Sequence, residues 1–396
     1  MSQVLACPQS SAPGITVVYM ENANSLESFF EPDIYSQRLN ETTRIARERG
    51  IDAIVIATGT DFAYLTGSWI SSHERLTALV LVGESRFIVV PNTDIADLKS
   101  SPIRDLDCEI IGWRDGQSPH QLVAEILGSA ARVAVGSQMT ADHLISLQAL
   151  SPQAEWVVAN EDLRELFMAK GPEEIAQLQA AAHAVDRVHA RVPALLKAGR
   201  SEAEVAEDLR SLMLQEHDVV DFIIVGSAEN GADPHHSYSD RVLEHGDPVV
   251  VDLGGSVGAG YHSDCTRTYV VGGDIDAAPE DFRQAYEVLS AAHQAACDTI
   301  SPGVTAESID RAARERIEAA GLGDLFIHRT GHGIGLSLHE EPFIMEGNTL
   351  ELQSGMAFSV EPGLYRPGKW GMRLEDIVTA TDEGFVSLNR ASRKLQ

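Results

Sequence analysis

The sequence predicts an α/β domain followed by an α+β domain. The chain has 396 residues, which is enough to build two ordinary hydrophobic cores. In the first part, short apolar runs rich in valine and isoleucine alternate with amphipathic segments, as strands and helices do in an α/β fold. After about residue 221, strands separated by glycine-rich stretches dominate and two further helical patterns follow. This change of pattern indicates an α+β arrangement in the second part.

The elements of the first domain follow from hydrophobic periodicity. Residues 1–32 carry few periodic signals, and we expect a loose extension there. Apolar residues at helical spacing between interspersed charges predict a helix from residue 33 to about Gly50. The expected strands are 51–58, 76–82, 86–91, 108–111 and 132–136, with helices near 117–128 and 140–149.

Residues 170–174, Lys-Gly-Pro-Glu-Glu, indicate the start of the second domain. Proline suits the first position of a helix, and acidic residues suit its first turn. We expect this helix to run to about Leu196 and a second one from Ser201 to about Glu216. Helices are also expected near 279–299 and 305–320. The predicted domains are therefore 33–170 and 171–396.

Composition excludes several classes of partner. The net charge of −29 disfavours nucleic acid and anionic membranes, because both need a positive protein surface. No apolar run approaches the 18 residues of a membrane span. The first positive charge is Arg38, so the sequence lacks the basic start of a secretory signal. Residues 4–7 resemble a lipoprotein cleavage box, but no apolar run precedes them. We therefore expect a cytoplasmic protein.

Cysteine usage agrees with that expectation. The four cysteines contain no C-x-x-C pair, which argues against a disulfide framework and against a thiolate zinc site. They are Cys7, Cys108, Cys265 and Cys297.

Two aspartates lie in apolar segments where a carboxylate is costly. Asp252 follows three valines in 248–255, and Asp264 lies in 261–271, the expected partner strand of a hairpin. Asp252 alone is equally compatible with a residue that caps a turn. A glycine-rich turn over 254–260 would bring both aspartates to neighbouring positions on one face. A cation between them would relieve their repulsion.

Three further residues complete a set of possible metal ligands. His332 lies among glycines, Glu361 ends an apolar strand, and Glu375 opens another. Each alone also fits an ordinary turn or strand end. Four carboxylates and one imidazole together carry a charge of −4, which two divalent cations would neutralise. Oxygen-rich ligation favours manganese, with cobalt, iron or zinc also compatible. Such a pair of ions can activate a water for hydrolysis.

These five residues and their motifs resemble the pita-bread metallopeptidases, the family of methionine aminopeptidase, prolidase and aminopeptidase P. The motifs are VDLGG, HSDCTRT, GHGIG, VEPG and RLED, in this order. The resemblance covers 172–396, and the segment before it, with FAYLTG at 62–67, is similar to the N-terminal domain of the prolidase and creatinase branch. Asp252 and Asp264 are twelve residues apart, where the usual separation is eleven; an extra residue in the turn would absorb the difference.

The resemblance implies a pita-bread catalytic domain, two metal ions and a homodimer. It also implies roles for individual side chains. Glu361 would be both a ligand and a proton shuttle. His235 would hydrogen-bond the substrate amide or the tetrahedral intermediate, although His236 beside it leaves the choice open. His339 would contact the substrate carbonyl or the proline side. His328 would line the proline pocket. Arg373, together with Tyr365, would orient the carboxylates.

The expected reaction is hydrolysis of the bond between an N-terminal residue and proline in a small peptide. Many prolidases carry an arginine where this chain has Phe343, and that arginine binds the C-terminal carboxylate of a dipeptide. A dipeptidase would therefore need another cation here, for which Arg366, Lys369 and Arg373 are candidates. Xaa-Pro dipeptidase and Xaa-Pro aminopeptidase both stay open.

Three other readings compete with a peptidase. Nucleotide binding is disfavoured, because no GK[ST] motif follows the glycine-rich stretches. A creatinase-like hydrolase that does not cleave peptides would typically lack some of the five ligands. A non-catalytic peptide-binding protein would not need them at all. We expect the N-terminal domain to supply dimer contacts and part of the rim of the neighbouring active site.

Overall fold

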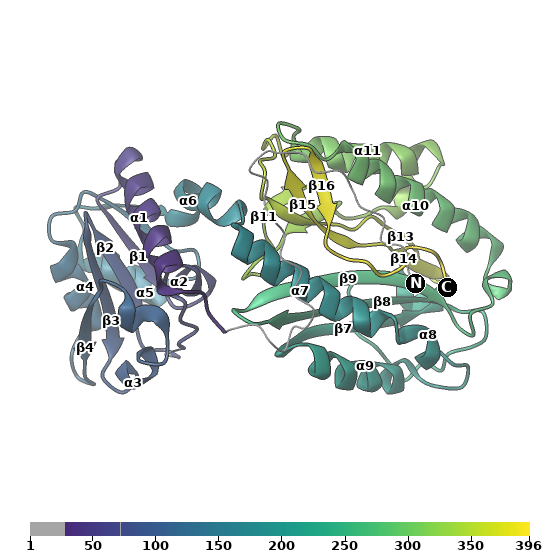
Figure 1. The fold of residues 1–396 in the computed structure, drawn as a ribbon, viewed down its shortest axis with the longest axis horizontal. Helices are drawn as coiled ribbons and strands as arrows, with labels where there is room; N and C mark the ends of the chain where they lie inside the picture. Colours follow the sequence, from purple (N-terminus) through teal and green to yellow (C-terminus); the bar gives the residue numbers. More distant parts are fainter. Residues whose placement is uncertain (1–27, 72) are drawn as a thin grey trace, which may run out of the picture.

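The computed structural model describes residues 28–71 and 73–396, which form two lobes that follow one another along the chain (Figure 1). The segment that resembles a lipoprotein box, and most of the predicted extension 1–32, lie outside the described residues. Among the helices of the described part, none is both long and apolar enough to cross a bilayer.

The N-terminal lobe is built on a mixed six-stranded sheet of order β4-β3-β2-β1-β5-β6. Alternate residues of its strands face opposite layers, as a period of two requires. Ile54 and Ile56 of β1 pack toward α1 and α2, whereas Val55 packs toward α4 and α5. The elements are α1 (Pro32–Glu48), β1 (Ala53–Ala57), α2 (Thr60–Thr66), β2 (Ala78–Val82), β3 (Ser85–Pro91), α3 (Ile95–Leu98), β4 (Glu109–Trp113), α4 (Pro119–Leu127), β5 (Arg132–Val135), α5 (Ala141–Leu150), β6 (Glu155–Val158) and α6 (Ala159–Met168).

The five strands and the three helices expected for this lobe are present. The sequence analysis missed β6 and the helices α2, α3 and α6. β6 is a four-residue edge strand that pairs only with β5, so its short sequence carries little periodic signal. The carboxyl ends of the parallel strands β1, β5 and β6 face the second lobe.

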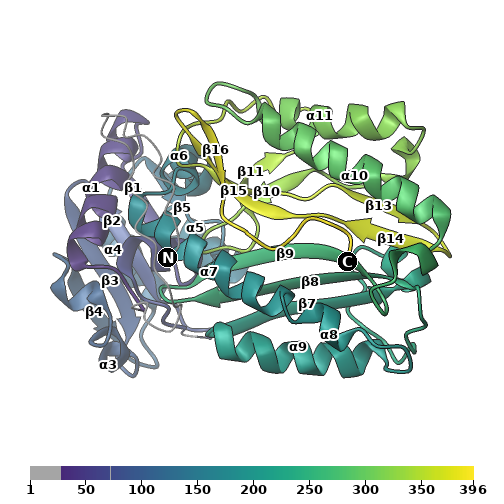
Figure 2. The same cartoon turned by 45° about the vertical axis from the view of Figure 1, so that its right-hand side comes forward.

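The C-terminal lobe has the expected pita-bread fold. The three-stranded sheet β7-β8-β9 is covered by α7 and α9, and α10 and α11 cover the five-stranded sheet β11-β10-β12-β15-β16 (Figures 1 and 2). Its elements are α7 (Pro172–His189), α8 (Val192–Leu195), α9 (Glu202–Glu216), β7 (Val219–Ser227), β8 (Pro248–Val257), β9 (Tyr261–Val270), α10 (Glu280–Thr299), α11 (Ala306–Ala319), β10 (Gly331–Gly333), β11 (Glu340–Ile344), β12 (Ala357–Val360), β13 (Gly363–Arg366), β14 (Trp370–Arg373), β15 (Asp376–Thr381) and β16 (Gly384–Ser387).

Two expectations for this lobe were wrong in detail. α7 begins at Pro172 as predicted but ends at His189, and a separate short helix, α8, carries Pro193 at its start. Proline lacks the backbone N–H that would continue the helix through that point. The stretch 254–257 belongs to β8 and is not a turn. Gly254 and Gly255 are needed there because a Cβ would lie 2.2 Å from the Phe222 ring and 2.6 Å from the Val219 carbonyl oxygen, respectively.

The two lobes are joined by a continuous core. Tyr261 and Ile334 of the second lobe belong to the same buried cluster as Leu39 of α1. The Tyr261 hydroxyl donates to Glu174 at 2.7 Å, and Arg38 forms an ion pair with Glu174 at 3.4 Å. These buried contacts set how the first lobe lies against the second.

Candidate active site

All five predicted ligands converge between the two sheets of the C-terminal lobe. The β8–β9 ladder pairs Asp252 with Thr266 and Gly254 with Asp264, without a bulge. The two aspartates therefore lie on one face at adjacent pairs, as the hairpin argument predicted and despite their twelve-residue separation. Ligand atoms within 4.8 Å of one another form three overlapping groups: Asp252, Asp264 and Glu375; His332, Glu361 and Glu375; and Asp264, His332 and His339.

The electrostatics of this cluster favour cations. Burial, followed by the neighbouring carboxylates, raises the pKa of Asp264 and of Glu375 well above the ordinary values. Burial also raises the pKa of Glu361 to about 7, against the opposing effect of Arg373. No described residue donates to Oδ1 of Asp252 or Oε1 of Glu375, although both atoms are buried. Such oxygens are costly without a partner, so the donor set fits a pair of divalent cations.

His332 is held in the tautomer that a metal ligand needs. Its Nδ1 lies 3.0 Å from the carbonyl oxygen of Gly333 and donates to it, which leaves Nε2 free. Nε2 lies 3.3 Å from Glu361 Oε1 and 3.6 Å from Asp264 Oδ2. Burial lowers the pKa of His332 to about 3, so the ring is neutral. Gly331 permits this position, since a Cβ there would lie 1.9 Å from the Ser359 carbonyl oxygen.

Arg373 contacts Asp252 directly and reaches Glu375 through Thr266. Its Nη2 donates to Asp252 Oδ2 at 2.5 Å, and its Nε donates to Thr266 Oγ1 at 2.9 Å. The Thr266 hydroxyl in turn donates to Glu375 Oε2 at 2.7 Å. The sequence analysis missed Thr266, although its place two residues after Asp264 in a strand puts it on the same face.

A hydrogen-bonded chain links Arg373 to the wall of the cleft. Arg373 Nη1 donates to the Tyr365 hydroxyl at 2.8 Å, and that hydroxyl lies 3.0 Å from His328 Nε2. His328 Nδ1 lies 2.7 Å from the Arg329 carbonyl oxygen. Burial lowers the pKa of His328 to about 4, so it is neutral. Tyr365 is buried and does not line the cleft, so it supports Arg373 and His328 and does not itself face substrate.

The cluster opens into a cleft of about 980 Å³. His235, His328 and His339 line it together with the five ligands. The rings of His332 and His339 are 3.8 Å apart between centroids. The three predicted substrate-contacting histidines thus surround the ligand cluster.

A buried acid, Glu202, distinguishes His236 from His235, because it binds one of the two neighbouring histidines away from the cleft. His236 Nε2 lies 2.9 Å from Oε2 of Glu202, which is fully buried on α9. Glu202 also accepts hydrogen bonds from the backbone N–H groups of Ser227 and Ser239, at 2.7 and 2.9 Å. His236 therefore anchors its loop to α9, while the exposed His235 faces the cleft.

The cations suggested for a substrate carboxylate do not serve that role. Arg366 and Lys369 both approach Asp281, at 3.4 and 3.9 Å, and neither lines the cleft. Arg373 is engaged by Asp252.

Arg329, which the sequence analysis did not consider, does line the cleft. Its guanidinium lies 4.5 Å from the centroid of the Phe343 ring, and its Nη2 is 3.4 Å from His339 Nδ1. Burial lowers the pKa of Arg329 below its usual value, and the nearby Glu361 carboxylate offsets only part of that effect. An arginine three residues before the histidine ligand was the available signal.

Comparisons with known proteins find relatives for both lobes of the chain. Residues 176–382 match the model of metallopeptidase family M24, and residues 38–168 match that of the creatinase/prolidase N-terminal domain. The chain is 47% identical to a probable dipeptidase PepE of Mycobacterium tuberculosis, over 92% of this chain and 97% of the relative. It is 32% identical to an Xaa-Pro dipeptidase of Lactobacillus helveticus, over 87% and 94%. The crystal structure of dipeptidase PepE from Mycobacterium ulcerans superposes with a TM-score of 0.89 at 47% identity, over 93% and 99%.

Proposed function

Because the chain belongs to metallopeptidase family M24, we propose that it is a dipeptidase that hydrolyses Xaa-Pro dipeptides. The relatives named above as dipeptidases support this substrate class. The observation that carries the proposal is a half-buried cation, Arg329, in the same cleft as the five-ligand cluster. A dipeptide brings its own C-terminal carboxylate close to the scissile bond, whereas a longer peptide does not.

The proposed centre holds two divalent ions, with manganese as the native metal. Its ligands are Asp252, Asp264, His332, Glu361 and Glu375. Ions held by these residues would lower the pKa of a bound water and polarise the peptide carbonyl. The two buried carboxylate oxygens without donors and the raised pKa values of the cluster support cation binding.

The chain's own groups supply the proton transfers and the hydrogen bonds. Glu361 lies among the ligands and lines the cleft, where its carboxylate can take a proton from water and return it to the leaving proline nitrogen. His235 and His339 face the cleft beside the ligands and donate to the developing oxyanion. An Xaa-Pro amide has no N–H of its own, so the leaving nitrogen depends on a proton delivered in this way.

Arg329 is proposed as the anchor for the substrate carboxylate. The guanidinium fork matches a carboxylate, and stacking on an aromatic ring restricts its rotamers before substrate arrives. Phe343, which occupies the place of the usual arginine, thus supports a cation from a different part of the chain. Arg210 also lines the cleft, but no contact links it to His339 or the ligands.

A substrate series tests this assignment. Metal-stripped protein with and without manganese is given Ala-Pro, Ala-Pro-Ala and the amide Ala-Pro-NH₂. We expect manganese-dependent cleavage of Ala-Pro only. Arg329→Gln should raise KM for Ala-Pro about tenfold or more, because a charge-assisted pair is lost. Preferred cleavage of Ala-Pro-Ala would replace the proposal with an Xaa-Pro aminopeptidase, and no cleavage of any peptide would favour a non-peptidase relative.

Two further properties belong to the proposal. We propose a homodimer, which light scattering on the purified protein tests directly. We also propose a cytoplasmic location, since the three described cysteines are free thiols, as expected in a reducing compartment. Fractionation of the source cells tests the location.

A further inference from the structure

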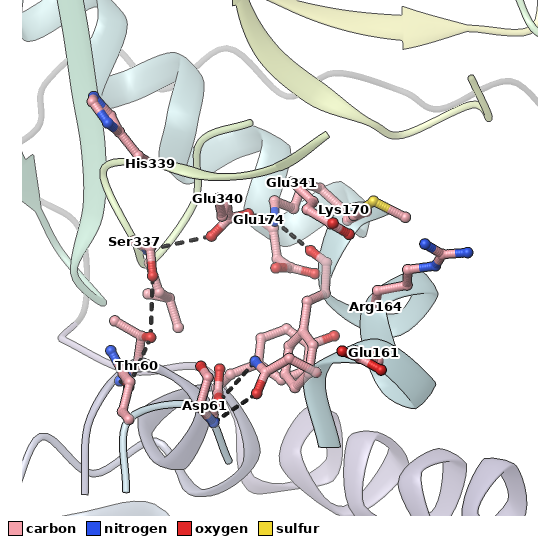
Figure 3. Close-up of a pocket in the computed structure, with 17 residues that line it drawn as sticks. Thr60, Asp61, Glu161, Arg164, Lys170, Glu174, Ser337, His339, Glu340 and Glu341 are labelled. Atoms are coloured by element: carbon pink, nitrogen blue, oxygen red, sulfur yellow. Dashed lines mark hydrogen bonds and ion pairs between the residues drawn. The ribbon is translucent and has the colours of Figure 1, made fainter. Parts of the chain in front are cut away.

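A second cavity, of about 400 Å³, lies between the two lobes (Figure 3). Its N-terminal wall is formed by residues that follow the parallel strands β1, β5 and β6, namely Thr60, Asp61, Ser137 and Asn160. In open α/β sheets, the crevice outside the carboxyl ends of parallel strands is the usual place for a ligand. The opposite wall is the loop of residues 336–341 from the C-terminal lobe.

Loop 336–341 separates this cavity from the catalytic cleft. Figure 3 shows Ser337 and Glu340 turned toward Thr60 and Lys170, and His339 lines the cavity from the same segment. His339 also lines the catalytic cleft, where its ring centroid lies 3.8 Å from that of His332. His339 therefore lies at the boundary between the two cavities, and residues 336–341 border both of them.

The N-terminal lobe holds this loop directly. The Ser337 hydroxyl lies 3.1 Å from the Thr60 hydroxyl, and Lys170 forms a buried ion pair with Glu340. Glu340 Oε2 also accepts from the Ser337 N–H at 3.3 Å. A change in the cavity therefore acts on the backbone that carries His339.

The charge of the cavity indicates the chemistry of an occupant. Asp61 is only 9% exposed, and burial raises its pKa. Its Oδ2 accepts from Asn160 Nδ2 at 2.9 Å, and no ion pair to Asp61 is found among the described residues. The other buried acids, Glu174 and Glu340, are paired with Arg38 and Lys170. Glu161, Arg164 and Glu341 also line the cavity but are exposed, so Asp61 is the buried acid there that has no ion pair among the described residues.

The remaining walls favour an organic cation over a metal ion. Tyr64, Phe167, Met168 and Leu336 give the cavity apolar surface. In the described part of the chain, every group of three potential metal ligands lies in the catalytic cleft. A volume near 400 Å³ is within the range of small-molecule sites.

We propose that this interdomain cavity binds a small molecule with a primary ammonium group beside a short apolar body, with the ammonium on Asp61, and that its occupancy lowers KM at the catalytic cleft. The occupant contacts both walls and restricts the motion of loop 336–341, so His339 is ordered before substrate binds. The free N-terminal amine of a peptide, or an amino acid released from one, has this chemistry. Only the effect on KM rests on the proposed dipeptidase function.

Calorimetry of the manganese-loaded protein tests the site itself. The probes are L-leucinamide, which has the ammonium and the apolar body, L-leucine, which adds a carboxylate, and 4-methylpentanamide, which lacks the ammonium. Because an amine can also bind at the catalytic ions, each titration is repeated on Asp61→Asn. We expect L-leucinamide to bind the native protein about tenfold or more tightly than Asp61→Asn, since a charge-assisted hydrogen bond is lost. Binding of L-leucine as well would identify free amino acids as a source of the ligand.

A second variant guards against a folding defect in Asp61→Asn. Ser137 is exposed at the cavity and its hydroxyl has no described partner, so Ser137→Trp fills the space without burying a charge. This variant should also lose the binding of L-leucinamide while its thermal unfolding stays cooperative. Equal affinity in the native protein and both variants, or equal affinity for 4-methylpentanamide, would overturn the site.

The kinetic arm tests the coupling. At the same saturating concentration of L-leucinamide, KM for Ala-Pro should be about fivefold lower, relative to its value without the ligand, in the native protein than in Asp61→Asn, which reports any competition at the catalytic ions. Binding that is lost in Asp61→Asn, together with an unaltered KM, would overturn the coupling but keep the site. If Ala-Pro is not cleaved at all, the proposed function fails while the calorimetric result still decides the site.

Discussion

Arg373 donates a 2.5 Å hydrogen bond to Asp252 in the buried centre of the catalytic lobe. This contact brings one positive charge into a group of four carboxylates and leaves the second oxygen of Asp252 without a donor. The same guanidinium reaches Glu375 through Thr266 and the cleft wall through Tyr365. One side chain thus links two of the proposed metal ligands to His328 on the cleft wall.

Replacement of Arg373 should weaken metal binding. Arg373→Met leaves Asp252, Thr266 and Tyr365 without their shared donor, so we expect metal affinity or activity to fall about 10–100-fold. Arg373→Lys retains the charge but not the forked guanidinium, so its metal affinity should lie between those of the native protein and Arg373→Met. Metal titration followed by elemental analysis measures the effect. Native metal affinity in Arg373→Met would contradict the orienting role.

Neutralising a ligand should have opposite effects on metal binding and on metal-free stability. Asp264→Asn should lose paired metal and nearly all turnover. The metal-free variant should nevertheless be more stable than the metal-free native protein by about 1–3 kcal/mol at pH 8, because a buried repulsive charge is gone. Denaturant unfolding with chelator present measures this. Retained activity, or a less stable metal-free variant, would refute the ligand assignment.

Stabilisation by manganese should grow as the pH rises. Glu361 has a pKa of about 7, and the pKa values of Asp264 and Glu375 are raised further, so the metal-free folded state keeps protons that the unfolded state has already lost. Those groups therefore destabilise the metal-free protein as the pH rises from about 4.5 through 7. Bound cations remove this penalty. The difference in Tm between loaded and metal-free protein should widen from pH 5.5 to 8; a constant difference would contradict the raised values.

The loop that carries His235 should depend on Glu202. Glu202→Gln weakens the hold on His236 and the loop, so we expect kcat to fall toward that of His235→Ala while two metals remain bound. The stability cost should be about 1–3 kcal/mol, since buried donors lose a charged acceptor. Glu207→Gln on the exposed face of the same helix is the matched control. Metal loss in Glu202→Gln or His235→Ala would show that this loop belongs to the metal site.

The sequence alone determined the parts of this protein that have a local signature. Strand and helix periodicity predicted most elements of both lobes, because burial of one face imposes a period of two or 3.6 on nearby residues. Carboxylates in apolar strands identified Asp252, Asp264 and Glu375, because a charge is costly there unless something compensates it. In the β8–β9 hairpin, alternate residues face the same side of the sheet, and this period of two placed both aspartates on one face.

Only the tertiary structure decided the contacts between distant segments. Arg329 on Phe343, Glu202 under His236, and Thr60 against Ser337 join residues 14, 34 and 277 positions apart, and no local period constrains such pairs. The same holds for Gly254 and Gly255, which resemble a turn in sequence but lie in a strand because β7 packs against them. Close packing of one segment on another, which a linear pattern does not contain, assigned these residues their places.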